Sequence, residues 1–168
     1  MTKRRIVAAA IVGGIILVVY QGVSSAQRGA APTSQNCLKG VWRGAEIRYT
    51  GTNARTVTNP PWIVIFTDKH VASIGIGSDA PRPEVQGQPT DKDLADAVRN
   101  LTAYASTYQV SDGEFTRTNL VSAFPNTMRL VATTTFRCEG KDTLVWTQKS
   151  TAAGPSANPT TWKFVRLE

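Results

Sequence analysis

Few side chains in this sequence could carry out acid–base or nucleophilic chemistry. His70 is the only histidine, and it follows a short turn, Thr67-Asp68-Lys69. No serine lies in a Gly-x-Ser-x-Gly segment that marks a nucleophile, and the sequence contains no phosphate-binding loop or dinucleotide-binding fingerprint. We therefore expect His70 to be a surface or turn residue, and we predict no catalytic residue.

Cys37 and Cys138 are the two cysteines of the chain. In an exported protein such a pair forms a disulfide more often than a metal site or a catalytic thiol. The bridge would close most of the domain into one loop, which stabilises a fold by about 4 to 5 kcal/mol in the loop-entropy model. With one histidine and two bridged cysteines, a metal site of the usual His and Cys type cannot be assembled, so we predict no metal and no cofactor.

Glu46 is the carboxylate with the most informative position. In a regular strand it shares a face with Trp42. If that face lines an interior, the carboxylate needs a partner such as Arg117, Arg129 or a ligand cation. Exposure of Glu46 on the outer face is the other outcome, and we favour it.

Residues 1–26 have the composition of an export signal. Lys3, Arg4 and Arg5 precede an apolar stretch from Ile6 to Tyr20, and Val23 to Ala26 supply small residues for cleavage. A retained N-terminal membrane anchor is the alternative. We therefore expect a periplasmic or secreted protein that touches a membrane only through residues 1–26, and only if they are retained.

The chain is basic, but its charge does not indicate a nucleic-acid partner. The formal net charge is +7 for the whole chain and falls to +4 without the leader. The remaining positive residues are scattered rather than grouped. A solvated surface accounts for that distribution, so we expect no nucleic-acid partner.

Short segments rich in β-branched and aromatic residues dominate the chain after a small, polar tether at residues 27–36. Turn-forming residues separate them, which is typical of strands joined by short turns. The predicted strands are 40–50, 62–66, 70–77, 104–111, 114–124, 128–138, 143–150 and 161–167. This pattern indicates an all-β, antiparallel barrel or sandwich over residues 37–168, and closure into a barrel removes exposed edges.

One helix is predicted after a proline-containing loop at residues 79–89. Thr90 begins it as the N-cap, and Asp93 completes a capping box. Leu94, Val98 and Leu101 form a narrow apolar stripe. We therefore expect the helix to lie over an end or a wall of the barrel.

Three segments carry a recognisable set of motifs: Leu38 to Arg43 (LKGVWR), Ile65 to His70 (IFTDKH) and Ala103 to Val110 (AYASTYQV). In order and spacing they resemble the bacterial lipocalin-like domain family, a branch of the calycin barrels. The resemblance spans about residues 38–167 and implies an eight-stranded antiparallel up-and-down barrel. Lipocalins stack a C-terminal arginine on the tryptophan of a Gly-x-Trp motif, which here implies a structural contact between Arg166 and Trp42. Members of the family are mostly of unassigned function, so the resemblance implies a fold rather than an activity.

The interior of an eight-stranded barrel is wide enough either to be filled by side chains or to hold one small ligand. Small residues at Gly75, Gly77, Ala132 and Thr134 leave room for a ligand, unless they only ease bends in their strands. The predicted binding residues combine apolar or aromatic walls with a few polar groups: Glu46, Trp62, Phe66, Tyr104, Tyr108, Arg117, Met128 and Leu130.

Three functions follow from this interpretation. The first is an exported protein that binds or sequesters a small hydrophobic or amphipathic ligand. The second is an enzyme of the cyclase or isomerase type, in which Glu46 or His70 would be the acid or base. The third is a structural or interaction domain whose barrel is packed solid.

Overall fold

The computed structural model describes residues 34–78, 80, 84–151 and 153–168. The predicted leader, residues 1–26, lies outside the described residues. The last residues of the predicted tether, 34–36, begin a short helix, α1 (Ser34–Leu38).

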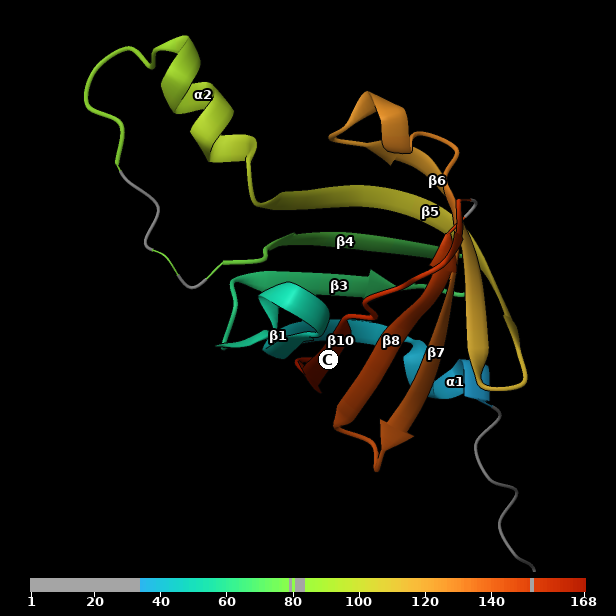
Figure 1. Ribbon diagram of the computed structural model, residues 1–168. Coiled ribbons are helices and arrows are strands. Elements are labelled where there is room, and N and C mark those ends of the chain that lie inside the picture. The colour runs from blue at the N-terminus through green and yellow to red at the C-terminus, as the bar shows by residue number, and fades with distance from the viewer. Residues whose placement is uncertain (1–33, 79, 81–83, 152) are drawn as a thin grey trace, which may run out of the picture.

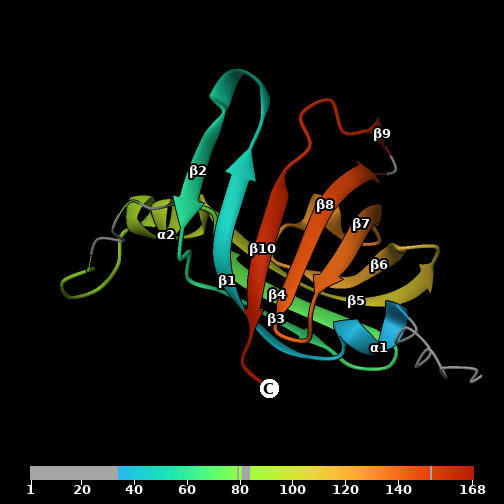
Figure 2. The same ribbon diagram turned by 90° about the horizontal axis from the view of Figure 1, so that it is seen from below.

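Eight antiparallel strands close into a barrel, as the sequence pattern and the family resemblance predicted. These strands are β1 (Gly40–Tyr49), β3 (Trp62–Phe66), β4 (His70–Ile76), β5 (Leu101–Ser111), β6 (Glu114–Ser122), β7 (Val131–Glu139), β8 (Thr143–Thr151) and β10 (Thr161–Arg166). Each strand pairs with the next along the chain, and β10 pairs with both β8 and β1 (Figures 1 and 2). The sandwich alternative is therefore wrong.

Short elements decorate this barrel. The strand β2 (Arg55–Thr58) pairs antiparallel with the second half of β1, and β9 (Gly154–Pro155) pairs with the last residues of β8. Two 3-10 turns, η1 (Gly51–Asn53) and η2 (Pro125–Thr127), lie at strand ends. The helix α2 (Asp91–Val98) connects β4 to β5. We name the two ends of the barrel after the helix found at each, the α1 end and the α2 end.

The alternation of side chains along the strands builds the core. In β3, Trp62, Val64 and Phe66 are buried, while Ile63 and Ile65 point outward and are about 40% exposed. Rings fill the α1 half of the interior: the Phe66 ring centroid lies 5.3 Å from that of Tyr108 and 5.6 Å from that of Phe115. This half of the barrel is a packed core.

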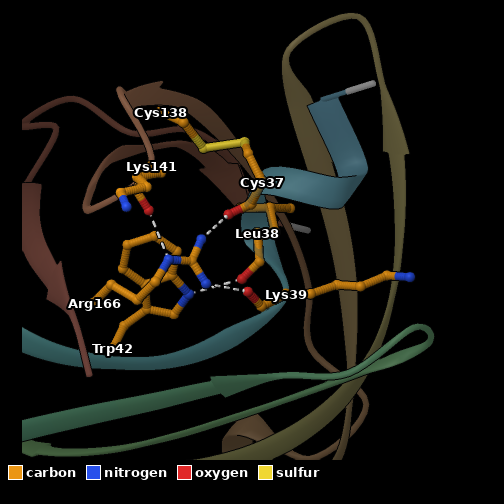
Figure 3. The surroundings of a disulfide bond; sticks show 7 residues. All are labelled: Cys37, Leu38, Lys39, Trp42, Cys138, Lys141 and Arg166. Carbon is orange, nitrogen blue, oxygen red and sulfur yellow. Dashed lines mark hydrogen bonds between the residues drawn. A yellow bond between two sulfur atoms is a disulfide. The ribbon is translucent and has the colours of Figure 1, made fainter. Parts of the chain in front are cut away.

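A single arginine closes the α1 end. Arg166 pairs with Trp42 across β10 and β1, and its guanidinium carbon lies 4.0 Å from the centre of the indole ring. The guanidinium donates hydrogen bonds to the carbonyl oxygens of Lys141 (2.6 Å), Lys39 (2.6 Å) and Cys37 (2.9 Å), as Figure 3 shows. The stacking of Arg166 on Trp42 that the resemblance implied is therefore present. The hydrogen bonds of Arg166 join β10 to the backbone of neighbouring segments, so its role is structural.

The disulfide lies beside this arginine. Cys37 of α1 and Cys138 of β7 are bonded as predicted, and the bridge spans 101 positions of the sequence (Figure 3). The indole Nε1 of Trp42 donates a hydrogen bond to the carbonyl oxygen of Leu38, at 2.7 Å. The bridge and the indole together fix α1 against the end of the barrel.

The prediction of a strand beginning at Met128 is wrong by three residues. The chain forms the turn η2 there, and Arg129 has a positive φ of 59°, which interrupts an extended ladder. The strand β7 begins only at Val131. Met128 is therefore 42% exposed, and neither it nor Leu130 belongs to the barrel wall.

The predicted helix forms, but it does not cover the barrel. Thr90 and Asp93 make the expected capping box. The helix has no buried residue, because Leu101 enters β5 and leaves only Leu94 and Val98 to form an apolar stripe. Figure 1 shows α2 beyond the start of β5, away from the strands. Within the described ranges, no helix combines the length and the apolar character needed to cross a membrane.

We predict that replacing both Cys37 and Cys138 by alanine lowers the free energy of unfolding by about 2 to 5 kcal/mol, because a loop of this length is no longer closed in the unfolded chain. Urea unfolding followed by tryptophan fluorescence measures the loss. Wild-type protein in reductant should match the double variant. A loss under about 1 kcal/mol would show that the bridge does not constrain the chain.

We also predict that Arg166→Met lowers the free energy of unfolding by about 2 to 4 kcal/mol, because it removes the charged hydrogen bonds to backbone carbonyls and the stacking on Trp42. Arg166→Lys should recover only part of this loss, since an ammonium lacks the planar fork. Thermal unfolding of both variants is the measurement. Equal stability of the two variants would contradict a role for the fork.

Candidate functional site

The α2 half of the barrel contains a partly open cavity of about 130 Å³. Its walls come from the ends of strands β3, β5, β7, β8 and β10 that lie nearest α2, and from the middle of β6. The lining residues are Trp62, Thr102, Tyr104, Phe115, Arg117, Thr134, Trp146, Gln148 and Trp162. The barrel is therefore packed in one half and hollow in the other.

Trp62 reaches its place because Gly75 faces it from the neighbouring strand. The two residues are paired across β3 and β4, and a Cβ atom on Gly75 would lie 2.0 Å from the indole ring. The Nε1 of Trp62 donates a hydrogen bond of 2.8 Å to Oγ of Ser73, which is fully buried. A glycine and a small hydroxyl on β4 thus hold the indole flat against the wall.

The expectation that Gly75 and Gly77 leave room for a ligand is wrong. The Trp62 ring occupies the space above Gly75. The Tyr49 hydroxyl occupies the space above Gly77 and donates a hydrogen bond of 3.0 Å to its carbonyl oxygen. These glycines accommodate aromatic side chains rather than an empty volume.

Aromatic rings form the larger part of the cavity wall. The ring centroids of Trp62 and Trp162 are 6.2 Å apart, and those of Trp146 and Trp162 are 6.1 Å apart, both in edge-to-face contact. Phe115 lies at the boundary with the packed core, 5.6 Å from Trp146. These rings favour a ligand with an apolar, flat body.

Arg117 brings the positive charge into this cavity. It is 7% exposed, and its guanidinium carbon lies 4.2 Å from the centre of the Tyr104 ring. Its Nη1 donates a hydrogen bond of 2.6 Å to Oδ1 of Asn119, which also accepts one from Oγ of Ser106 at 2.8 Å. The amide of Asn119 is held in turn by its own bond to the carbonyl oxygen of Thr127, at 2.9 Å. A buried polar chain therefore fixes the position of Arg117.

The structure brings three of the predicted binding residues together and separates the others. Trp62, Tyr104 and Arg117 line the cavity. Phe66 and Tyr108 are buried in the packed half instead. The Tyr108 hydroxyl donates a hydrogen bond of 2.7 Å to the carbonyl oxygen of Thr67, and burial raises the pKa of this phenol.

Glu46 does not share the inner face with Trp42, so that prediction is wrong. A β-bulge between Gly44 and Glu46 inserts Ala45 as an extra residue and reverses the alternation. Glu46 consequently points outward, where Nη2 of Arg48 lies 3.0 Å from its carboxylate. Met128 and Leu130, which precede β7, are also absent from the lining of this cavity.

His70 lies at the exposed tip of the β3–β4 turn, as predicted for a surface residue. It borders a larger concavity of about 1140 Å³ on the outside of the barrel, between α1 and the outer face of β5 and β6. Exposed polar side chains such as Lys69, Gln109 and Thr116 line that surface. Tyr108 is the one aromatic residue among the described residues that line it, whereas five aromatic residues line the inner cavity, so we place the candidate site there.

The described ranges contain no group of three His, Cys, Asp or Glu side chains placed to hold a metal ion. The polar groups of the cavity are instead hydroxyls, an amide and the guanidinium.

Several lining residues were not predicted as binding residues. Trp146 and Trp162 are cross-strand partners on β8 and β10, so the alternation of those strands could have assigned both to the interior. Gln148 follows on the same face of β8. Thr102 lies between the end of the predicted helical stripe at Leu101 and the predicted strand start at 104, and its inward position required the true start of β5.

No protein-family model matches this chain, and no curated protein is similar to it. Among solved structures, a de novo designed fluorescence-activating β-barrel is 11% identical with a TM-score of 0.43, over 80% of this chain and 97% of that one. A second barrel, EF1p2_mFAP2b bound to DFHBI, is 14% identical with a TM-score of 0.43, over 80% of this chain and 97% of that one. At these values the likeness is too distant to indicate a function.

We predict that Gly75→Ala lowers the free energy of unfolding by about 1 to 3 kcal/mol, because the new methyl group displaces the Trp62 indole. Combining it with Trp62→Leu should remove the clash. The two changes should therefore be coupled by at least about 1 kcal/mol in a double-mutant cycle measured by urea unfolding. Additive effects would show that the indole does not lie over Gly75.

Proposed function

We propose that this protein binds one small, mainly apolar molecule in the α2 half of its barrel. The observation that carries the proposal is a partly open cavity walled by Trp62, Trp146, Trp162 and Phe115 in a barrel whose other half is packed. A solid structural barrel would have side chains in this volume.

The size of the cavity limits the size of the ligand. An engineered apolar cavity of about 150 Å³ holds a benzene molecule, and pockets for drug-sized ligands are about 300 to 1,000 Å³. At 130 Å³ this cavity suits a molecule with a single aromatic ring or a similar number of atoms. Larger molecules would need movement of the walls.

We also propose that the protein is an exported member of the lipocalin-like family, with residues 1–26 as a cleaved leader or a membrane anchor. The closed barrel, the Arg166–Trp42 stacking and the Cys37–Cys138 bridge support this proposal. The disulfide is compatible with an oxidising compartment.

The enzyme alternative receives less support from the geometry. Glu46 and His70 were its candidate acid and base, and both lie outside the cavity. The lining contains neither a histidine nor a carboxylate among the described residues. Binding therefore accounts for the site better than acid–base catalysis.

We predict that benzene binds the full-length protein with a dissociation constant on the order of 0.1 to 1 mM, and that anthracene does not bind. Thr134→Phe should abolish benzene binding, because the ring fills the cavity from β7. Ligand-observed NMR measures both results.

Thr133→Phe is the matched control. Thr133 is the preceding residue on β7 and faces outward, where its hydroxyl lies 3.0 Å from that of Thr116. This variant should keep the wild-type affinity for benzene. Absence of benzene binding to the wild-type protein, or equal loss in both variants, would refute an internal binding site.

A further inference from the structure

Arg117 carries a positive charge that no described acidic side chain neutralises. None of the ion pairs between described residues includes it. Its charge faces only the ring of Tyr104 and the neutral amide oxygen of Asn119. A guanidinium has five N–H donors, so most of them lack a protein acceptor in the described structure.

Arg166 shows what a structural arginine looks like in the same barrel. Its guanidinium donates to four backbone carbonyl oxygens, those of Cys37, Lys39, Lys141 and Glu168. Arg117 is buried at 7% exposure, yet it donates to a single amide oxygen of the protein. Because a buried charge without a counterion is costly, these two contacts give little structural reason for an arginine at position 117.

A second donor of the cavity lining lacks a partner. The indole Nε1 of Trp162 is buried, and it makes no hydrogen bond in the described part of the chain. The Nε1 of Trp62, on the same wall, is satisfied by Ser73. Tryptophan N–H groups usually find a partner when they are buried, so this part of the barrel tolerates an unused donor next to the cavity.

The other polar side chains of the lining are also uncommitted. No hydrogen bond between described residues involves the hydroxyls of Thr102, Tyr104 or Thr134, or the amide of Gln148. These groups surround a cavity whose one formal charge is the guanidinium. The site therefore offers an excess of donors and a positive field to whatever enters it.

We infer that the ligand is an anion, a small aromatic or apolar carboxylate, whose negative group is bound by Arg117. This inference rests on the proposed binding function and adds the charge of the ligand to it. The body of the ligand packs against Trp62, Trp146 and Phe115. Benzoate, a single ring with one carboxylate, matches the volume of 130 Å³ and serves as the probe.

Three ring compounds of nearly one shape test the inference by isothermal titration calorimetry on the full-length protein at pH 7. Benzoate carries a negative charge, benzamide is neutral and benzamidine is positive. We expect benzoate to bind at least tenfold more tightly than benzamide, and benzamidine to show no binding. A buried guanidinium that lacks a counterion would produce this order.

Two variants assign the effect to the side chain of Arg117. Arg117→Met should weaken benzoate at least tenfold and leave benzene within twofold, and its melting temperature should equal or exceed that of the wild type. Arg43→Met, which changes an exposed arginine on the outer face of β1, is the control and should change nothing.

The failures of the two proposals are distinguishable. Equal binding of benzoate and benzamide, or an unchanged benzoate preference in Arg117→Met, would overturn the anion site while benzene binding still supports the cavity. If neither benzoate nor benzene binds, the binding function itself is refuted, and the inference with it. A lower melting temperature of Arg117→Met with unchanged benzoate affinity would make Arg117 a structural residue.

Discussion

The pairing of β10 with both β8 and β1 is the constraint on which the rest of the structure depends. It turns the sheet into a closed wall and gives every strand one inner face. On β10 that face carries Trp162, Phe164 and Arg166 in alternation. Trp162 lines the cavity, Phe164 is fully buried in the core, and Arg166 closes the α1 end. The single strand β10 therefore contributes to the cavity, to the packed core and to the closed α1 end.

The two halves of the barrel contribute differently to the stability of the fold. In the α1 half the polar atoms are satisfied: Arg166 donates to carbonyl oxygens, Trp42 donates to Leu38, and Tyr108 donates to Thr67. In the α2 half Trp162 keeps an unused donor, and Arg117 keeps an uncompensated charge. The packed, disulfide-linked half supplies stability that offsets the cost of polar groups with no partner in the other half. Such groups are typical of places where function rather than folding selects the residue.

Sequence reasoning succeeded where local chemistry decides the structure. The capping box at Thr90 and the turn between β3 and β4 depend on neighbouring residues, and both form as predicted. The disulfide could be predicted because two cysteines in an exported chain have few alternative roles. The strand pattern left a barrel or a sandwich open, and the family resemblance implied both the closed barrel and the stacking of Arg166 on Trp42.

It was harder to predict which side chains of a strand face the interior of the barrel. Alternation assigns a residue to the inner face only if no bulge intervenes, and bulges interrupt the pairs β1–β10, β5–β6 and β7–β8. The first of these reversed the orientation of Glu46. Thr102 was missed for a related reason, since its face depends on where β5 begins. Gln148 lies on the face of Trp146 within the predicted strand 143–150, so alternation could have assigned it to the interior. Gly75 was misjudged because its purpose depends on a ring from another strand, which no local pattern shows.

The bulge in β1 also shapes the chemistry of the site. If the strand continued through Ala45 without a bulge, Glu46 would stand on the face of Trp42 and bring a carboxylate into the interior that contains Arg117. With the bulge, Glu46 pairs across to Lys163 and contacts Arg48 on the outer surface. A carboxylate inside would compete with an anionic ligand for the guanidinium. By turning Glu46 outward, the backbone leaves the positive charge of Arg117 available to a molecule that enters the cavity.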